Sequence, residues 1–485
     1  MNALLLTVLL AACGGGDAAS DGAARLDADP RPDVVLLSLD TVRDDAVDPE
    51  AAPTLTALAA RGVRFAWALS HAPTTAASHA SLFTGHDLHG HGVARNGVVL
   101  PSRTAAGAAL PTLAERFAAA GWETAGVVGA SVLDGKTGIH RGFGRWDASF
   151  RVARSHRHED LADGVTDRAL EVARTRDRAK PLFLFVHYFD AHGPYDAPAP
   201  WTTRWVDPGY AGPFDGTPDA TRALADALRA GTANPADVAA LRARYRGEVS
   251  WIDAQISRLL AGLALRDNTI VAVVGDHGEV LGEIPARPIG HGSDVDLVAT
   301  HVPMILAGGM VPRGQRVEAP VGTSDLGTTL LVVAMGGASD GGAAPRASDT
   351  SLVTAPLGDG RDLTALWTAG SSLPARDLFL EATQPADRGA DPLGPWPNLA
   401  LERGVVRGTD LLLLAPWLHA PPLVYRVAAG QPLVEAPDLT ARTGTLLDAL
   451  QAWDARAPGG SGAVPELDAA LEALGYKEPA TPSAP

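Results

Sequence analysis

The chain has 485 residues, of which 46% are hydrophobic, and a mean hydropathy of +0.05, values typical of a globular protein with a sizeable core. Forty Lys and Arg residues against 56 Asp and Glu residues give a formal net charge of −16, which disfavours nucleic acid as a partner. We expect one large core with a smaller subdomain rather than several equal domains.

The N-terminus has the pattern of an export signal. Met1–Ala12 is apolar but too short to span a membrane as a mature helix, and it ends in Leu10-Ala11-Ala12-Cys13. This ending resembles the lipobox of bacterial lipoproteins, which implies that Cys13 is lipidated and anchors the chain to a membrane of the cell envelope. The alternative is an ordinary secretory signal with an incidental cysteine. Because Cys13 is the single cysteine, we expect neither disulfides nor thiol chemistry in the mature chain.

The next segments predict an α/β core. Residues 14–31 are rich in Gly, Ala and Asp and indicate a flexible tether, so that the folded part begins near Pro32. Five apolar runs predict buried strands: Val34–Leu39, Thr124–Gly129, Leu182–His187, Thr269–Gly275 and Pro303–Ala307. Helical patterns lie between them, at Pro53–Ala60, Pro111–Ala120 and Pro235–Leu263. This alternation favours a mostly parallel sheet with helices on both faces.

The pattern changes after about residue 310. Ser324–Met335 predicts a helix, and residues 336–375 have a loop composition. Val405–Leu414 and Leu423–Val427 predict two antiparallel strands, and Pro465–Leu474 predicts a last helix. We therefore expect a core over 32–335, a smaller C-terminal α+β subdomain over 336–475 and a disordered tail over 476–485.

Four separated segments carry side chains suited to metal and ester chemistry. They are Val35–Asp44, with Asp40 at the end of a strand; Ala72–Gly85, which is followed by His91–Gly97; Phe185–Tyr195; and Val274–Glu279, which is followed by Gly290–Gly292 and His301–Leu306. Their order and spacing resemble the sulfatase family of the alkaline phosphatase superfamily over roughly residues 33–310. The resemblance implies an α/β sandwich with a mostly parallel central sheet and an enzyme that hydrolyses ester bonds.

The nucleophile segment departs from the family pattern. Thr75 stands where the family has a cysteine, Ala77 where it has a proline and His79 where it has an arginine. Sulfatases convert that cysteine, or a serine, to formylglycine, and a threonine cannot become formylglycine. The resemblance therefore implies that Thr75 itself is the nucleophile, as in phosphate-ester and phosphotransfer relatives.

The resemblance also implies one divalent metal ion, held by Asp40, Asp276 and His277 with the oxygen of Thr75. A dication lowers the pKa of a bound hydroxyl and offsets charge on the substrate. Two carboxylates with an imidazole suit Zn²⁺ or Mn²⁺ better than Ca²⁺.

The remaining candidates surround this expected centre. His192 and His291 are candidates to protonate the leaving group, because imidazole titrates near neutral pH. By resemblance, the residues expected to contact the substrate are His79, Arg95, Asn96 and His187. For His79, Arg95 and His187 a purely structural role is the open alternative. His86, His89 and His91 are interpreted as part of a loop at the mouth of the site rather than as a separate metal cluster.

These features predict a metal-dependent hydrolase of phosphate monoesters, phosphate diesters or phosphonates that works through a covalent Thr75 intermediate. Two alternatives stay open: a sulfuric ester hydrolase that acts without formylglycine, and a non-catalytic binding lipoprotein. The expected substrate is a small molecule or an ester of an envelope glycan or lipid, and nucleic acid is not expected as a partner.

Overall fold

The structure is a computed structural model that describes residues 29–150, 159–284, 287–336, 355–368, 372–383, 402–414, 423–426, 434–435 and 440–456. The expected lipidation site Cys13, most of the 14–31 tether and the expected helix Pro465–Leu474 lie outside the described residues, as does the 476–485 tail. In the described part of the chain, none of the helices combines the length and the apolar character that a membrane span requires.

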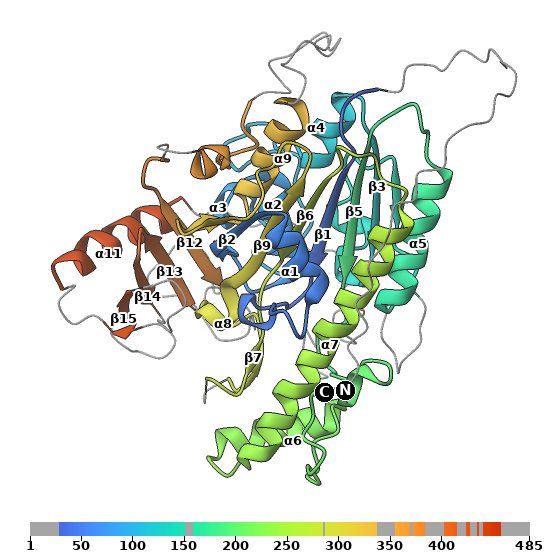
Figure 1. Cartoon of the computed structure of the whole chain (residues 1–485). Coiled ribbons are helices and arrows are strands. Elements are labelled where there is room, and N and C mark those ends of the chain that lie inside the picture. The colour runs from blue at the N-terminus through green and yellow to red at the C-terminus, as the bar shows by residue number, and fades with distance from the viewer. Residues whose placement is uncertain are drawn as a thin grey trace, which may run out of the picture.

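A nine-stranded sheet forms the centre of the molecule (Figure 1). Its strands are β1 (Val34–Leu39), β2 (Gly62–Leu69), β3 (Glu123–Val128), β4 (Arg145–Asp147), β5 (Leu182–Tyr188), β6 (Ile270–Gly275), β9 (His301–Gly308), β10 (Gln315–Val317) and β11 (Val321–Gly322). The order is β10-β2-β9-β6-β1-β5-β3-β4, and β11 also pairs with β2. Only β9 runs antiparallel to its neighbours among these strands, so the sheet is mostly parallel, as expected.

Helices cover both faces of this sheet. The helices are α1 (Pro53–Ala60), α2 (Thr75–Thr84), α3 (Leu88–His91), α4 (Leu113–Ala119), α5 (Ala162–Thr175), α6 (Pro218–Arg229), α7 (Pro235–Gly262), α8 (Leu297–Thr300) and α9 (Asp325–Gly336). Alternate residues of β1 face two cores: Val34 and Leu36 pack with α2, α4 and α9, whereas Val35 and Leu37 pack with α1, α5 and α7. Burial on both faces explains why the strand has an unbroken apolar sequence.

A second, antiparallel sheet follows the central one. It comprises β12 (Asp377–Ala382), β13 (Glu402–Arg407), β14 (Asp410–Leu414), β15 (Leu423–Arg426) and β16 (Val434–Glu435), in that order, and α11 (Thr440–Asp454) packs against it. The single strand expected over Val405–Leu414 was wrong. The chain reverses there at Gly408 and forms the β13–β14 hairpin. Gly408 has a φ of +60°, a backbone conformation that glycine adopts without a steric penalty.

Short elements complete the described structure. Strands β7 (Val280–Leu281) and β8 (Ile289–Gly290) pair as an antiparallel two-stranded ribbon, which follows β6 in the chain. Short 3₁₀ helices lie at Asp44–Ala46, Ser131–Leu133, Gly135–Thr137, Trp201–Thr203 and Thr364–Trp367.

Candidate active site

The candidate site lies where three neighbouring parallel strands end. Strand β1 runs between β5 and β6, with Leu39 in register with Tyr188 on one side and Gly275 on the other. Asp40 follows β1 directly, and Asp276 follows β6 directly. The carboxyl ends of parallel strands meet at one edge of a sheet, which is where ligands bind in α/β folds. The strand pattern therefore brings together two carboxylates that are 236 positions apart in the chain.

Thr75 reaches the same edge from helix α2, of which it is the first residue. Its hydroxyl donates a hydrogen bond to Asp40 Oδ2 at 3.1 Å, and its Oγ1 lies 3.4 Å from His277 Nε2. The free amides of a helix N-terminus stabilise negative charge nearby. Thr75 is thus placed where an oxyanion on its side chain would be favoured.

Asp40, Asp276 and His277 fit a divalent cation. One ligand atom from each lies within 4.8 Å of the others, and all three residues are buried. Within the described residues, Asp40 Oδ1 and Asp276 Oδ2 have no hydrogen-bond partner, which is costly for buried carboxylates. A cation between these oxygens would remove that cost.

Neighbouring backbone groups orient two of these ligands. Asp276 Oδ1 accepts hydrogen bonds from the amides of Thr41 at 3.1 Å and His277 at 2.7 Å, so the other carboxylate oxygen is left for a ligand. His277 Nδ1 lies 3.0 Å from the carbonyl of Gly278, which assigns the proton to Nδ1 and leaves a lone pair on Nε2.

Burial controls the charges of this cluster when it holds no ion. It raises the pKa of Asp40 to about 7, although the nearby His277 and the bond from Thr75 favour the carboxylate. Burial, and then the charge of Asp40, also raise the pKa of Asp276. Two carboxylates that resist ionisation side by side are the arrangement that a bound cation stabilises.

His192 and His291 lie at the same centre. The His291 ring is 4.5 Å from the His277 ring and 5.0 Å from the His192 ring, between centroids. His291 Nδ1 lies 3.0 Å from Glu279 Oε1. Glu279 was not predicted as a site residue, although an acidic residue two positions after His277 is a usable signal. Burial lowers the pKa of His291 to about 4, so its imidazole is neutral at pH 7 before an anionic substrate arrives.

The expected substrate contacts have different environments. Asn96 Oδ1 accepts a hydrogen bond from the amide of Ala76 at 2.8 Å, which fixes the first turn of α2. His187 Nε2 lies 3.2 Å from Asp40 Oδ2.

His79 Nδ1 lies 2.7 Å from the carbonyl of Thr75, and its Nε2 lies 2.8 Å from Ser38 Oγ. Arg95 is half-buried, and no hydrogen bond or ion pair joins it to the other site residues in the described part of the chain.

His86, His89 and His91 bind separate partners. His86 pairs with Asp359 at 2.9 Å, and His89 pairs with Glu381 at 3.0 Å. His91 Nε2 lies 3.0 Å from Ser81 Oγ. These contacts tie the segment around α3 to α2 and to the second sheet.

Comparison with known proteins decides the family. The sulfatase family model matches residues 32–337, which is more than half of the chain. The chain belongs to the sulfatase family. Members of this family are metal-dependent hydrolases of ester bonds, and the site above has the side chains to hold a metal ion.

Individual relatives agree with this assignment. The uncharacterized sulfatase YidJ of Escherichia coli (strain K12) is 25% identical over 355 residues, which cover 63% of this chain and 68% of the relative. An arylsulfatase of Clostridium perfringens (strain 13 / Type A) is 24% identical over 319 residues, which cover 52% of this chain and 64% of the relative. The fold matches that of a phosphonate monoester hydrolase of Agrobacterium radiobacter with a TM-score of 0.61 at 18% identity, over 87% of this chain and 95% of the other.

Proposed function

We propose that this sulfatase-family hydrolase cleaves phosphate monoesters, phosphate diesters or phosphonates through a covalent intermediate on Thr75, without formylglycine. The observation that carries the proposal is the placement of Thr75. Its hydroxyl stands at the first turn of α2, 3.1 Å from Asp40 Oδ2 and 3.4 Å from His277 Nε2. A phosphorus-transferring threonine needs a position of this kind, with a proton acceptor, a cation site and a helix N-terminus.

The chain's own residues have separate roles in this reaction. Asp40 accepts the hydroxyl proton of Thr75, and the helix N-terminus favours the resulting oxyanion. Thr75 Oγ1 forms a bond to phosphorus as the bond from phosphorus to the leaving oxygen breaks, and the leaving oxygen takes a proton from His192 or His291. The ring of His291 lies close to those of His277 and His192, and Glu279 orients it. A bound divalent cation supplies Lewis acidity and offsets negative charge at this centre. Water then releases the product from Thr75.

The donor set supports Zn²⁺ or Mn²⁺ as the ion. Asp40, Asp276 and His277 offer two carboxylates and one imidazole, and Ca²⁺ instead favours six to eight oxygen ligands.

The substrate and the location of the protein belong to this proposal. We infer that the substrate is a small-molecule ester or an ester of an envelope glycan or lipid. We infer that the protein binds this substrate at a bacterial membrane, to which Cys13 anchors the chain. The −16 charge supports a substrate other than nucleic acid.

The test compares the wild type with Thr75→Ala on three matched nitrophenyl substrates: a phosphate monoester, a phosphate diester and a sulfate ester, each with Zn²⁺ or Mn²⁺. We expect turnover of a phosphorus ester and a loss of at least about 10³-fold in kcat for Thr75→Ala. Thr74→Ala is the matched control, because it removes a neighbouring hydroxyl that makes no hydrogen bond in the described structure. Its activity should stay within a few-fold of the wild type.

The same assay separates the alternatives. The arylsulfatase relative favours sulfuric ester hydrolysis as the second candidate. Turnover of the sulfate ester alone would therefore identify the protein as a sulfuric ester hydrolase and exclude the proposed activity on phosphorus esters. A protein that turns over none of the three esters and retains no divalent cation would instead be a binding lipoprotein.

A further inference from the structure

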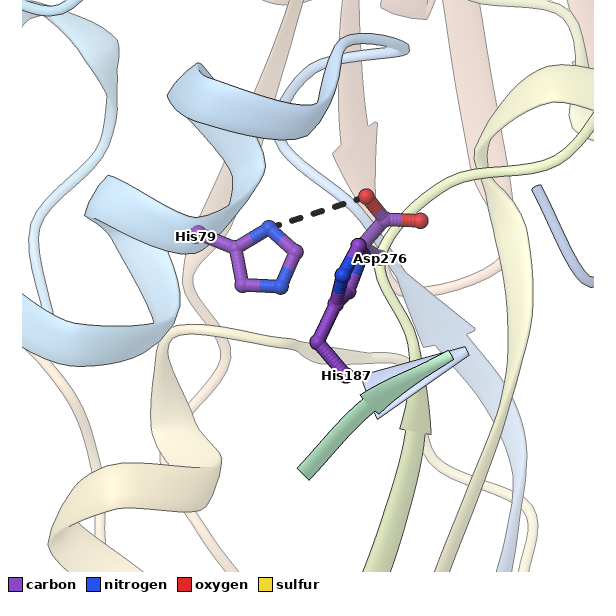
Figure 2. Close-up of side chains that lie close together, drawn as sticks. All are labelled: His79, His187 and Asp276. Atoms are coloured by element: carbon purple, nitrogen blue, oxygen red, sulfur yellow. Dashed lines mark ion pairs between the residues drawn. The ribbon is translucent and has the colours of Figure 1, made fainter. Parts of the chain in front are cut away.

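A second group of metal-competent side chains adjoins the first. His79, His187 and Asp276 each offer one ligand atom within 4.8 Å of the others, and all three are buried (Figure 2). The group comes from α2, β5 and the end of β6. We propose that it holds a second divalent cation, beside the ion at Asp40 and His277. The proposal goes beyond the proposed function, because it concerns the number of ions and can be tested without a substrate.

Asp276 is placed to serve both ions. Backbone amides occupy its Oδ1, whereas Oδ2 has no hydrogen-bond partner in the described structure. This free oxygen lies 3.6 Å from His79 Nδ1 and 3.6 Å from His277 Nε2. One oxygen thus faces one imidazole of each group, which is the placement that a carboxylate shared by two cations requires.

His187 has the hydrogen bonding of a ligating histidine. Its Nε2 lies 3.2 Å from Asp40 Oδ2, and its Nδ1 has no partner among the described residues. Histidines that bind metals commonly engage a carboxylate through one ring nitrogen, which orients the ring. A buried imidazole with one unpaired nitrogen is otherwise costly, so the ion accounts for an arrangement that protein contacts alone leave unexplained.

Nδ1 of His79 can offer a lone pair to a metal ion if the ring proton moves from Nδ1 to Nε2. Without an ion, its Nδ1 is close to the carbonyl of Thr75 at 2.7 Å and its Nε2 to Ser38 Oγ at 2.8 Å. With an ion on Nδ1, the ring proton moves to Nε2 and is donated to Ser38.

His79 of the second group packs against the hydrophobic core. The His79 ring packs 5.8 Å from Phe185 and 6.3 Å from Phe83, between centroids, and both phenylalanines are fully buried. His79 also stands where the family pattern has an arginine. A neutral imidazole does not replace the positive charge of that arginine, but an imidazole that binds a dication does. In such apolar surroundings a fixed positive charge acts strongly on a nearby oxyanion.

The experiment counts ions in the full chain. The protein is stripped with a chelator, reloaded with Zn²⁺ alone, freed of excess ion by gel filtration and analysed by mass spectrometry of the metal. We expect about two Zn²⁺ per chain in the wild type and about one in the double variant His79→Asn/His187→Asn. Asparagine at position 79 keeps a donor for the carbonyl of Thr75. The double variant Asp40→Asn/His277→Asn should retain about one Zn²⁺, and the control His86→Asn about two.

The outcomes that overturn the proposal are clear from the wild type alone. One Zn²⁺ per wild-type chain excludes a second cation, whether or not any variant folds. Two ions in a folded His79→Asn/His187→Asn variant would place the second ion elsewhere. Replacement of Zn²⁺ by Co²⁺ gives an independent readout: the visible absorption of the wild type should fall to a single-site spectrum in this variant. Failure here leaves the phosphorus-ester assay unaffected, and the reverse also holds.

Discussion

Asp40 illustrates how a functional side chain lowers stability until its ligand arrives. Burial raises the pKa of Asp40 to about 7, whereas an exposed aspartate titrates near 4. The folded state therefore holds this proton more tightly than the unfolded state does. The contribution of Asp40 to the free energy of unfolding is most favourable below about pH 4, declines between pH 4 and 7, and stays at its least favourable value above pH 7.

The prediction is that Asp40→Asn stabilises the metal-free protein at pH 8, by about 2–4 kcal/mol, but not at pH 4. Urea unfolding of chelator-treated protein at the two pH values measures this difference. Asp267→Asn, which removes an exposed carboxylate, is the matched control and should change the free energy of unfolding by less than about 0.5 kcal/mol. An equal effect of Asp40→Asn at both pH values would mean that Asp40 is not held protonated. Addition of Zn²⁺ at pH 8 should stabilise the wild type more than the variant.

The same residues show what the sequence could reveal about the site. Asp40 and Asp276 were predictable, because each directly follows an apolar run that reads as a buried strand. The hydrogen bonds between Ser38 and His79 and between His291 and Glu279 were not predictable, because they depend on how separate elements pack. Sequence spacing indicates which strand ends meet, but it does not indicate which side chains meet there.

Among the elements, α2 carries the nucleophile and is held at its end by a tightly packed glycine. Gly85 follows the helix with φ of +72°, and a Cβ at this position would lie 1.8 Å from the carbonyl oxygen of Leu357. The atoms nearest to this Cβ are backbone atoms of Leu357 and Gly358, which have little freedom to move aside. The end of α2 is thus fixed against a segment more than 270 residues away in the chain.

We expect Gly85→Ala to lower the free energy of unfolding by more than about 3 kcal/mol, and to reduce activity by displacing Thr75. The matched control is Gly107→Ala. Gly107 has a similar φ of +81°, but no atom of the described residues lies within 4 Å of its added Cβ, so only the backbone strain of about 1–2 kcal/mol remains. Denaturant unfolding of both variants tests the difference. Equal losses of unfolding free energy in the two variants would show that the close contact with Leu357 does not contribute to the effect of Gly85→Ala.

Elements with clear boundary signals were predicted best. Pro53–Ala60 was predicted with its observed bounds, because a proline begins it and Gly62 lies just beyond its end. Helix α4 begins two residues later than expected, since Thr112 caps it in a capping box with Glu115. Strand β2 was missed: Arg64 interrupts its apolar run, and its pairing with β9 is a long-range contact that local pattern does not contain.

For the molecule as a whole, Trp453 joins the C-terminal sheet to the catalytic part of the chain. Its ring stacks on His89 at 3.6 Å and on Phe379 at 5.0 Å, between centroids. Its indole nitrogen donates to Asp87 Oδ2 at 2.7 Å, and its carbonyl oxygen lies 3.0 Å from His89 Nδ1. One buried side chain of α11 therefore contacts both the segment around α3 and strand β12.

Trp453→Ala should lower stability by about 3–5 kcal/mol and speed proteolysis of the C-terminal part first. Trp453→Phe keeps a ring but loses the bond to Asp87, so a smaller loss of about 1–2 kcal/mol is expected. Thermal unfolding and timed digestion measure both effects. Met310→Ala, at a side chain that is 66% exposed, is the control and should be nearly neutral. Proteolysis that begins in the central sheet instead would contradict this role of Trp453.

The place of β1 in the strand order has a consequence for biosynthesis. This strand is made first, yet it lies in the middle of the sheet, and its two neighbours β5 and β6 begin only at residues 182 and 270. A growing chain therefore carries an apolar segment with two unpaired edges while some 140 further residues are added. A ribosome-bound intermediate of this kind needs protection from association with other chains, so we infer that production of the protein depends on chaperones more than its final stability suggests.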